Sequence, residues 1–265
     1  MNRVLLRLSC KPLRIAAIAF AALLASGCAS APARTTMDDP WQGLNRGVYK
    51  FNDTLDRAAL KPVAKGYKKI TPGWLRTGIG NLLTNLEYPA TILNQFLQGK
   101  GVTALKDTGR FLANTTLGLG GLFDVATPMG LEAHDEDLGQ TLAVWGVPSG
   151  PFVTMPFFGP SSVRDAPSRI ADFFLDPLGY MDVPWEVTWG KRGIDVVHTR
   201  AELLAIDPTL ERTFDPYAFT RDAWVQQREF DIYDGNPPQE EFEDFSEDEN
   251  PAPGAEPNSE SPPDP

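Results

Sequence analysis

The chain contains few of the residues that catalysis and metal binding use most. Its 265 residues include two histidines and two cysteines. Neither His134 nor His198 has another histidine or cysteine at the spacing of a metal site. Ser149 lies in the sequence Gly-Val-Pro-Ser-Gly, which departs from the Gly-x-Ser-x-Gly nucleophile motif. We therefore expect no catalytic residue, no metal and no cofactor, and a protein that is not an enzyme. Around His134, the sequence favours a solvated hydrophilic loop over a weak cation site formed with Asp135 and Asp137.

Long apolar runs and clustered positive charge are also missing. The apolar run over residues 15–24 is shorter than the stretch of about 20 residues that crosses a membrane as a helix. The formal net charge is -11, and no part of the chain has the basic footprint of a nucleic-acid binder. We find no internal repeat. A nucleic-acid partner is therefore not expected.

The N-terminus has the pattern of a lipoprotein signal peptide. Four basic residues and no acidic residue precede the end of the apolar run, and Ala25-Ser26-Gly27-Cys28 follows it. A basic region, a short apolar region and small residues before a cleavage point are typical of secretory signals. The pattern predicts a signal peptide over residues 1–27 and lipidation of Cys28. An ordinary cleaved signal followed by a chance cysteine is the alternative, and Ala25 stands where lipoprotein signals usually have leucine.

The same cysteine predicts where the protein is held. Cys10 lies in the removed segment, so the mature chain has one cysteine and no internal disulfide. Several acyl chains hold a protein stably on a bilayer. Residue 29 is alanine, whereas an aspartate there commonly retains lipoproteins at the inner membrane. We expect a lipid-anchored protein at the periplasmic face of the outer membrane.

Composition divides the mature chain into three parts. Residues 28–37 form a short linker rich in alanine and threonine. Residues 234–265 contain eleven acidic residues, eight prolines and no lysine or arginine. Such a segment cannot bury enough apolar surface to offset its ordering entropy and is expected to be disordered. The region between, residues 38–233, is one domain by length.

That domain is expected to be mainly helical. An Asp-Pro or Thr-Pro pair is a helix-start signal, and such pairs occur at residues 39–40, 71–72, 176–177, 207–208 and 215–216. Apolar residues follow two of them at spacings of three and four, which predicts amphipathic helices after Pro40 and Pro72. Further helices are expected to start near Pro89, Val102, Pro167, Pro184 and Pro216. Residues 152–155 are the best strand candidate.

Short motifs follow one another in a fixed order along this domain. In chain order the main ones are DPWQGLNR at 39–46, NLEYPA at 85–90, NQFLQG at 94–99, GLGGLFDVA at 118–126, GPFV at 150–153, PFFG at 156–159 and DPY at 215–217. No single motif is decisive, but the ordered set is specific and covers nearly all of residues 38–233. In this set the chain resembles the VacJ/MlaA family of outer-membrane phospholipid-transport lipoproteins.

The resemblance implies both an architecture and a function. It implies a single all-α, ring-like domain of amphipathic helices with a central lipid channel, lying in the inner leaflet of the outer membrane. Such a protein would remove mislocalised phospholipids from the outer leaflet and pass them to a soluble periplasmic carrier, which maintains lipid asymmetry. Its partners would be the phospholipid, the bilayer reached through Cys28, a trimeric porin and the carrier.

Two groups of residues are candidates for the lipid path. The first is a glycine-rich apolar segment that we expect to border the channel or act as a hinge: Leu117, Gly118, Leu119, Gly120, Gly121, Leu122, Phe123 and Val125. Glycine disfavours a rigid helix, so a tight core turn is the alternative. The second group is Lys191 and Arg192, which follow tryptophans in a predicted helix. The resemblance gives Lys191 the role of a channel-lining cation that binds lipid phosphate, and a solvated helix face is the alternative.

Two hypotheses of different classes follow. The first is a lipid-transfer module with an amphipathic channel. The second is a structural lipoprotein that scaffolds outer-membrane partners without lipid transfer and has a filled core. A hydrolase has no support in the sequence.

Overall fold

The structure is a computed structural model that describes residues 38–175 and 184–238, without the side chains of residues 172–175. The predicted signal peptide, Cys28, the linker and residues 239–265 of the predicted tail lie outside the described residues. The expected helix start at residues 176–177 also lies outside them.

Helices dominate the described part of the chain. In sequence order the elements are α2 (Gln42–Leu55), a π-helical turn (Asp56–Leu60), α3 (Lys61–Ile70), α4 (Gly73–Leu97), α5 (Gly101–Thr116), a short 3-10 turn (Thr127–Met129), α6 (Leu138–Val144), β1 (Phe152–Met155), β2 (Gly159–Ser162), α7 (Asp165–Leu175), α8 (Trp185–Leu203), α9 (Asp207–Arg212) and α10 (Pro216–Ile232). The strand expected over residues 152–155 is confirmed as β1.

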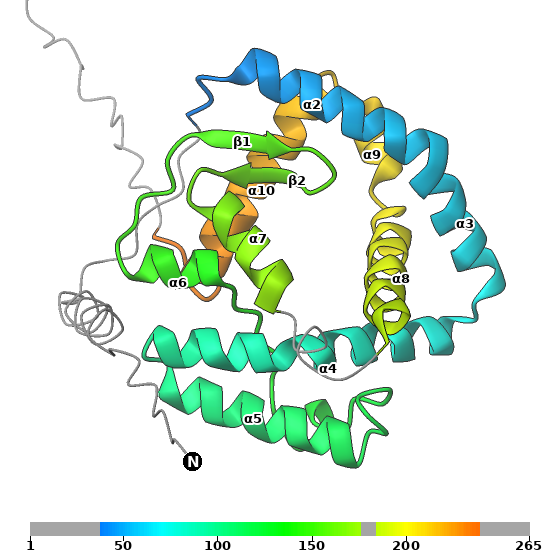
Figure 1. The fold of residues 1–265 in the computed structure, drawn as a ribbon, viewed down its shortest axis with the longest axis vertical. Coiled ribbons are helices and arrows are strands. Elements are labelled where there is room, and N and C mark those ends of the chain that lie inside the picture. The colour runs from blue at the N-terminus through cyan, green and yellow to red at the C-terminus, as the bar shows by residue number, and fades with distance from the viewer. Residues whose placement is uncertain (1–37, 176–183, 239–265) are drawn as a thin grey trace, which may run out of the picture.

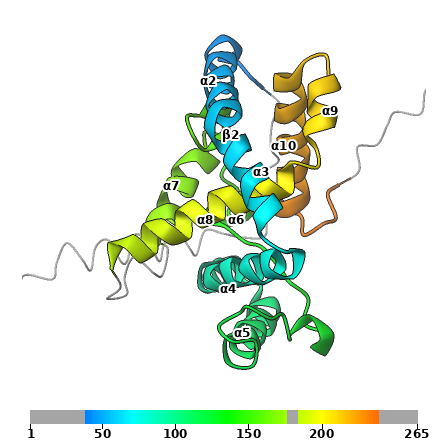
Figure 2. The ribbon, with the colours of Figure 1, turned by 90° about the vertical axis from the view of Figure 1, so that its right-hand side faces the viewer.

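The helices are arranged as a ring (Figure 1). The continuous run of α2 and α3 forms one side, and α4 forms the next. On the other side lie α6, α7, α10 and the β-hairpin, while α8 packs against both α3 and α4. Helix α5 packs against α4 outside the ring (Figure 2). The predicted mainly helical, ring-like domain is therefore confirmed.

Polar groups join segments that are far apart in the sequence and so close the ring. Asp39, just before α2, accepts hydrogen bonds from Asn45 of α2 and from the hydroxyl of Tyr217 in α10. Arg200 of α8 donates to Asp56 at 2.7 Å and to Asp207 at 2.9 Å. Charge-assisted hydrogen bonds of this kind are stronger than neutral ones. Helices that share little apolar core are therefore held together by ion pairs.

The antiparallel β-hairpin is tied to α2 in the same way. Phe152 pairs with Ser162 in the register, and Met155 pairs with Gly159. The amide of Asn45 donates to the Phe152 carbonyl and accepts from the Thr154 N–H, which satisfies backbone groups on one edge of β1. A two-stranded hairpin is marginal by itself, so this side-chain pairing stabilises it.

The interior is rich in polar side chains, and many large apolar side chains are exposed. The largest fully buried side chains are Phe152 and several polar ones, among them Gln95, Asn45, Thr141 and Asp107. On α2 the predicted amphipathic helix is present, but its single buried residue is Asn45, whereas the apolar residues at positions 44, 51 and 55 are exposed. On α5, which lies outside the ring, exposed apolar residues at positions 102, 105 and 112 form a stripe. Contiguous exposed apolar surface marks contact with a partner or a membrane.

One predicted helix start is wrong. Pro89 lies inside α4, which runs without a break from Gly73 to Leu97. Proline in a helix interior removes a backbone hydrogen bond, but tertiary contacts hold both halves of α4 in place. Tyr88 accepts a hydrogen bond from Arg110 of α5, and Gln95 donates to the buried Asp107. Within the described ranges, none of the helices has the length and apolar character needed to cross a membrane.

Candidate functional site

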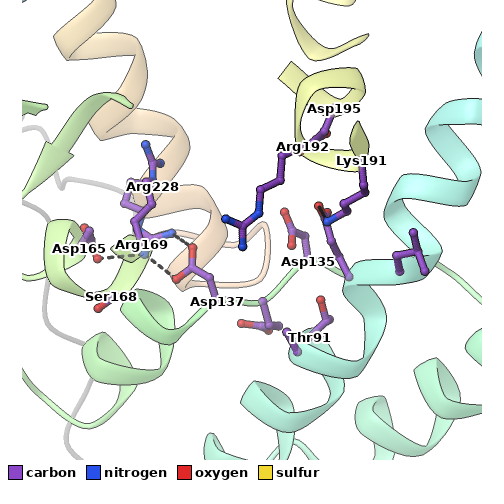
Figure 3. Close-up of a pocket in the computed structure, with 14 residues that line it drawn as sticks. Thr91, Asp135, Asp137, Asp165, Ser168, Arg169, Lys191, Arg192, Asp195 and Arg228 are labelled. Carbon is purple, nitrogen blue, oxygen red and sulfur yellow. Dashed lines mark hydrogen bonds and ion pairs between the residues drawn. The ribbon is translucent and has the colours of Figure 1, made fainter. Parts of the chain in front are cut away.

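A cavity of about 450 Å³ is lined by elements that surround the interior of the ring (Figure 3). Its lining residues come from α4, from the segment that leads into α6, and from α7, α8 and α10. Cavities of about 300–1,000 Å³ are the usual size for binding small ligands. We therefore take this cavity as the candidate site.

Charged side chains of both signs line the cavity. The basic ones are Arg169, Lys191, Arg192 and Arg228, and the acidic ones are Glu87, Asp135, Glu136, Asp137, Asp165 and Asp195. The sequence predicts two of these cations, Lys191 and Arg192, in a headgroup site and does not predict the acidic residues there. A mixed set of charges in one cavity suits a ligand that itself has separated charges.

One wall is a closed ion-pair cluster. Arg228 of α10 donates to both carboxylate oxygens of Asp137 at 2.6 and 2.8 Å, and to Asp165 at 2.9 Å. Arg164 donates to Asp165 from the other side at 3.0 Å. Burial alone would raise the pKa of both carboxyl groups. Arg228 outweighs burial at Asp137, and Arg164 together with Arg228 outweighs it at Asp165, so both pKa values lie below 3.8. These carboxylates are charged at neutral pH and already paired, so this wall is structural.

The opposite wall is α8, which carries the predicted headgroup-binding residues. The Lys191 ammonium lies 3.6 Å from the Glu87 carboxylate of α4. Arg192 is directed into the cavity (Figure 3), with its guanidinium 5.4 Å from the centre of the Trp189 ring. Both predicted cations therefore line one cavity, and their function as headgroup ligands stays a prediction.

Glu87 is an unusual carboxylic acid. Its side chain lines the cavity and is 53% accessible. Desolvation by these walls raises its pKa to about 7, with Lys191 opposing and the nearby Asp195 and Asp135 adding to the rise. Glu87 therefore changes charge near neutral pH.

Asp135 projects into the cavity from the segment before α6 (Figure 3). Its backbone carbonyl accepts a hydrogen bond from Gln140, which holds the segment in place. Within the described residues its carboxylate makes no hydrogen bond or ion pair. Burial raises the pKa of Asp135, and the neighbouring Asp137 adds to the rise. Because it lines the cavity and is unpaired among the described residues, this carboxylate is suited to receive a positive charge.

The predicted glycine-rich segment packs against α4 away from the charged cavity. After α5 the chain turns back through residues 117–123, and Asn85 of α4 donates to Thr115 and to the Gly120 carbonyl. No residue between 117 and 125 lines the charged cavity. The structure therefore does not bring the two predicted groups together in this site. They lie on different faces of α4.

Within this segment the backbone is tightly held while the apolar side chains are exposed. Leu117, Leu119 and Phe123 are 68%, 70% and 54% exposed. A side chain at Gly121 would lie within 2.4 Å of Asn85, and Gly121 has a φ of 100°, so only glycine fits. The interpretation as a tight turn thus holds for the backbone. The exposed side chains leave the lipid-path interpretation open, and the hinge stays a prediction.

The structure corrects the expectation for His134. The imidazole is half-buried, and its Nδ1 lies 3.1 Å from the carboxylate of Asp107, which is fully buried in α5. His134 therefore does not combine with Asp135 and Asp137. Among the described residues, no group of three or more acidic, histidine or cysteine side chains could hold a metal ion. The loop is anchored because the buried Asp107 needs partners.

No feature of the sequence predicts that these acidic residues line a cavity. Asp135 is one of 35 acidic residues, and folding alone brings it opposite Lys191 and Arg192, whereas Asp195 shares α8 with both cations. Glu87 lies in one of the family-like motifs, NLEYPA, but nothing in the motif predicts that its side chain faces a cation from α8.

The fold and the site together define a class of protein. A helical ring with charged groups around an internal cavity and large apolar side chains exposed is arranged to contact both an apolar surrounding and a polar ligand group. Comparison with known proteins narrows this class to a family.

The model of the MlaA lipoprotein family matches residues 37–231. The Escherichia coli (strain K12) intermembrane phospholipid transport system lipoprotein MlaA is 37% identical over 223 residues, which cover 82% of this chain and 88% of the relative. The Haemophilus influenzae protein of the same description is 30% identical, with 75% and 80% covered. A solved structure described as "Structural basis for maintenance of bacterial outer membrane lipid asymmetry" is 37% identical, matches with a TM-score of 0.65, and covers 74% of this chain and 99% of its own.

The chain therefore belongs to the MlaA lipoprotein family, as the motifs indicated.

Proposed function

We propose that this protein transfers phospholipids between membranes and so maintains the lipid asymmetry of the outer membrane. It removes mislocalised phospholipids from the outer leaflet and passes them to a soluble periplasmic carrier. The proposal extends to this chain what the names of its relatives describe. No covalent step is part of it.

The observation that carries the proposal is the charged cavity inside a ring whose large apolar side chains are exposed. A phospholipid has a charged headgroup and acyl chains, so it needs a polar cavity next to apolar surface. Burial of the acyl chains contributes about 0.8 kcal/mol per CH₂ group. Lys191 and Arg192 supply positive charge for the phosphate. A scaffold that binds no lipid gives no reason for a charged cavity of this size.

The apolar segment at residues 117–125 fits the second half of that requirement. Its exposed leucines and phenylalanine present an apolar border beside α4. We assign it to the acyl chains, while the cavity between α4 and α8 receives the headgroup. In this assignment α4 separates the two regions that one lipid would contact in turn.

The lipid anchor and the partners are part of the same proposal. Lipidation of Cys28 would hold the ring at the periplasmic face of the outer membrane, with its exposed apolar surface in the inner leaflet. The stripe on α5 is suited to lipid or to the apolar face of a membrane protein, and a trimeric porin is the proposed neighbour. A soluble carrier would collect the lipid on the periplasmic side.

The first test measures outer-leaflet phospholipid in cells with and without the protein, using an outer-leaflet enzyme that consumes phospholipid. We expect phospholipid to accumulate on loss of the protein. The wild type should reverse the accumulation, and Cys28→Ala should not. Unchanged outer-leaflet phospholipid, with normal porin and envelope integrity, would favour the scaffold.

A second variant distinguishes lipid transfer from scaffolding. Leu119 is 70% exposed and has a φ of 54°. Aspartate tolerates this backbone conformation better than leucine does, so Leu119→Asp adds a charge without straining the fold. Lipid transfer should collapse while anchoring and porin association persist. Unimpaired transfer in a correctly localised Leu119→Asp protein contradicts the proposed apolar path.

A further inference from the structure

Three acidic side chains in the cavity are not explained by a role in binding lipid phosphate. Asp135, Asp195 and Glu87 lie in the same cavity as Lys191 and Arg192. Carboxylates repel phosphate and weaken a site that serves an anion alone. Their presence therefore needs a positive ligand group or a structural partner.

Structural partners account for the other acids of the cavity but not for these three. Asp137 and Asp165 are bound by Arg228, and Glu136 accepts from Lys100 at 2.7 Å. By contrast, among the residues that the structure describes, the carboxylates of Asp135 and Asp195 make no hydrogen bond or ion pair. Glu87 has a single cation at 3.6 Å, beyond ordinary hydrogen-bond distance.

The arrangement of these groups matches a zwitterion. The cations Lys191 and Arg192 come from α8, and Asp135 approaches from the segment before α6 on the facing side (Figure 3). An ethanolamine headgroup has its phosphate and its primary ammonium two carbons apart. If the phosphate lies at α8, the ammonium extends toward Asp135 across the cavity, with Glu87 of α4 and Asp195 of α8 at its side. An anionic glycerol headgroup would leave the same carboxylates without a partner.

We infer that this cavity selects zwitterionic phospholipids with a primary ammonium: Lys191 and Arg192 bind the phosphate, and Asp135, with Asp195 and Glu87, binds the ammonium. The inference rests on the proposed function, because it names the headgroup that the transferred lipid carries. Asp135 is the specificity-determining residue, since its carboxylate lines the cavity on the side facing the two α8 cations and is unpaired among the described residues.

The test is a competition for loading. The full-length lipidated protein, purified in detergent, is incubated with vesicles of equal parts isotope-labelled phosphatidylethanolamine and phosphatidylglycerol. After repurification, bound labelled lipid is measured by mass spectrometry as a total and as a ratio. We expect an ethanolamine preference on the order of threefold to fivefold, the range for a partly exposed ion pair.

Two variants and one control test whether Asp135 and Asp195 cause the ethanolamine preference. Asp135→Asn should bring the ratio close to one while total bound lipid stays at the wild-type level. The double variant Asp135→Asn with Asp195→Asn should do so if one carboxylate substitutes for the other. Glu132→Gln removes an exposed acid from the same segment but outside the cavity, and it should keep the wild-type ratio.

Each outcome has a distinct meaning. Total binding without a preference in the wild type overturns the inference but leaves the proposed function standing. An unchanged ratio in the double variant, or an equal loss in Glu132→Gln, also overturns it. No labelled lipid on the wild type overturns the proposed function itself. Circular dichroism of each variant, matching the wild type, shows that the ratio was measured on folded protein.

Discussion

The ion-pair cluster around Arg228 gives the most direct test of how the ring is held together. We consider Arg228→Met, which keeps much of the side-chain length but removes the charge. Arg228 is 9% exposed and Asp165 is 5% exposed, whereas Asp137 is 38% exposed. Removing one partner of a buried ion pair destabilises a protein by about 3–5 kcal/mol.

The structure places the expected effect at the lower end of that range. After the substitution Asp165 keeps its hydrogen bonds from Arg164, and Asp137 is accessible enough to be hydrated. We therefore expect a loss of about 3 kcal/mol, which corresponds to a fall in Tm of roughly 6–12 °C for a domain of this size. The measurement is thermal unfolding of the lipidated protein in detergent, followed by circular dichroism at pH 7.

A control variant and a second pH make the test specific. Arg46→Met breaks a pair of the same chemistry and distance, Arg46 with Asp215 at 2.6 Å, but both side chains are exposed. Its effect should be much smaller, because exposed pairs contribute little.

The pH dependence has a definite sign. Arg228 at Asp137, and Arg164 with Arg228 at Asp165, hold the pKa of each carboxyl group below 3.8, so the stability that they contribute is present above that pH and is lost as the pH falls through the lowered values. In the variant both carboxylates protonate more easily, so the deficit should shrink between pH 7 and pH 4. A deficit equal to that of Arg46→Met, or one independent of pH, would refute the reasoning.

Three further perturbations probe the same framework. A Cβ at Gly139 would lie 2.3 Å from Nη2 of Arg228, so Gly139→Ala should lower Tm although alanine favours helices; an unchanged Tm would show that the cluster can shift. His134→Ala removes a partner of the buried Asp107 and should lower the free energy of unfolding by about 1–3 kcal/mol in denaturant titrations. Glu87 has a pKa of about 7, so raising the pH from 6 to 8 should charge it and increase the ethanolamine preference in the loading assay. The stability that its protonated form contributes falls as the pH rises from 4.5, its ordinary pKa, and is lost above about 7.

Much of the fold could be predicted because helix starts in this chain are marked locally. Proline at or near the first turn is compatible with a helix, and α2, α4, α8 and α10 begin within two residues of the prolines that predicted them. At α10 the side chain of Asp215 caps the helix by accepting from Ala218. Signals of this kind lie within a few residues and need no tertiary information.

The features that the sequence did not predict depend on contacts between segments that are far apart in the chain. Helix α4 continues through Pro89 because side chains from α5 and α6 hold its second half, and these contacts are invisible in a local window. Strand β2 consists of Gly-Pro-Ser-Ser, which has low strand propensity, and it forms because β1 pairs with it. The role of Lys191 could be proposed from the resemblance, but Glu87 and Asp135, which come from other elements, meet it only once the ring has closed.

The amphipathic pattern of α2 shows why periodicity alone could not separate the two functional hypotheses. Spacings of three and four predict which residues share a face, but they do not tell whether that face meets a protein core or an apolar phase outside the protein. In the structure the apolar face of α2 is largely exposed, and the buried residue, Asn45, instead binds the backbone of β1. A scaffold with a filled core would bury the apolar face and expose the asparagine. The observed arrangement is stable where apolar surface is not in contact with water, and this is the condition that a ring lying among lipid acyl chains would meet.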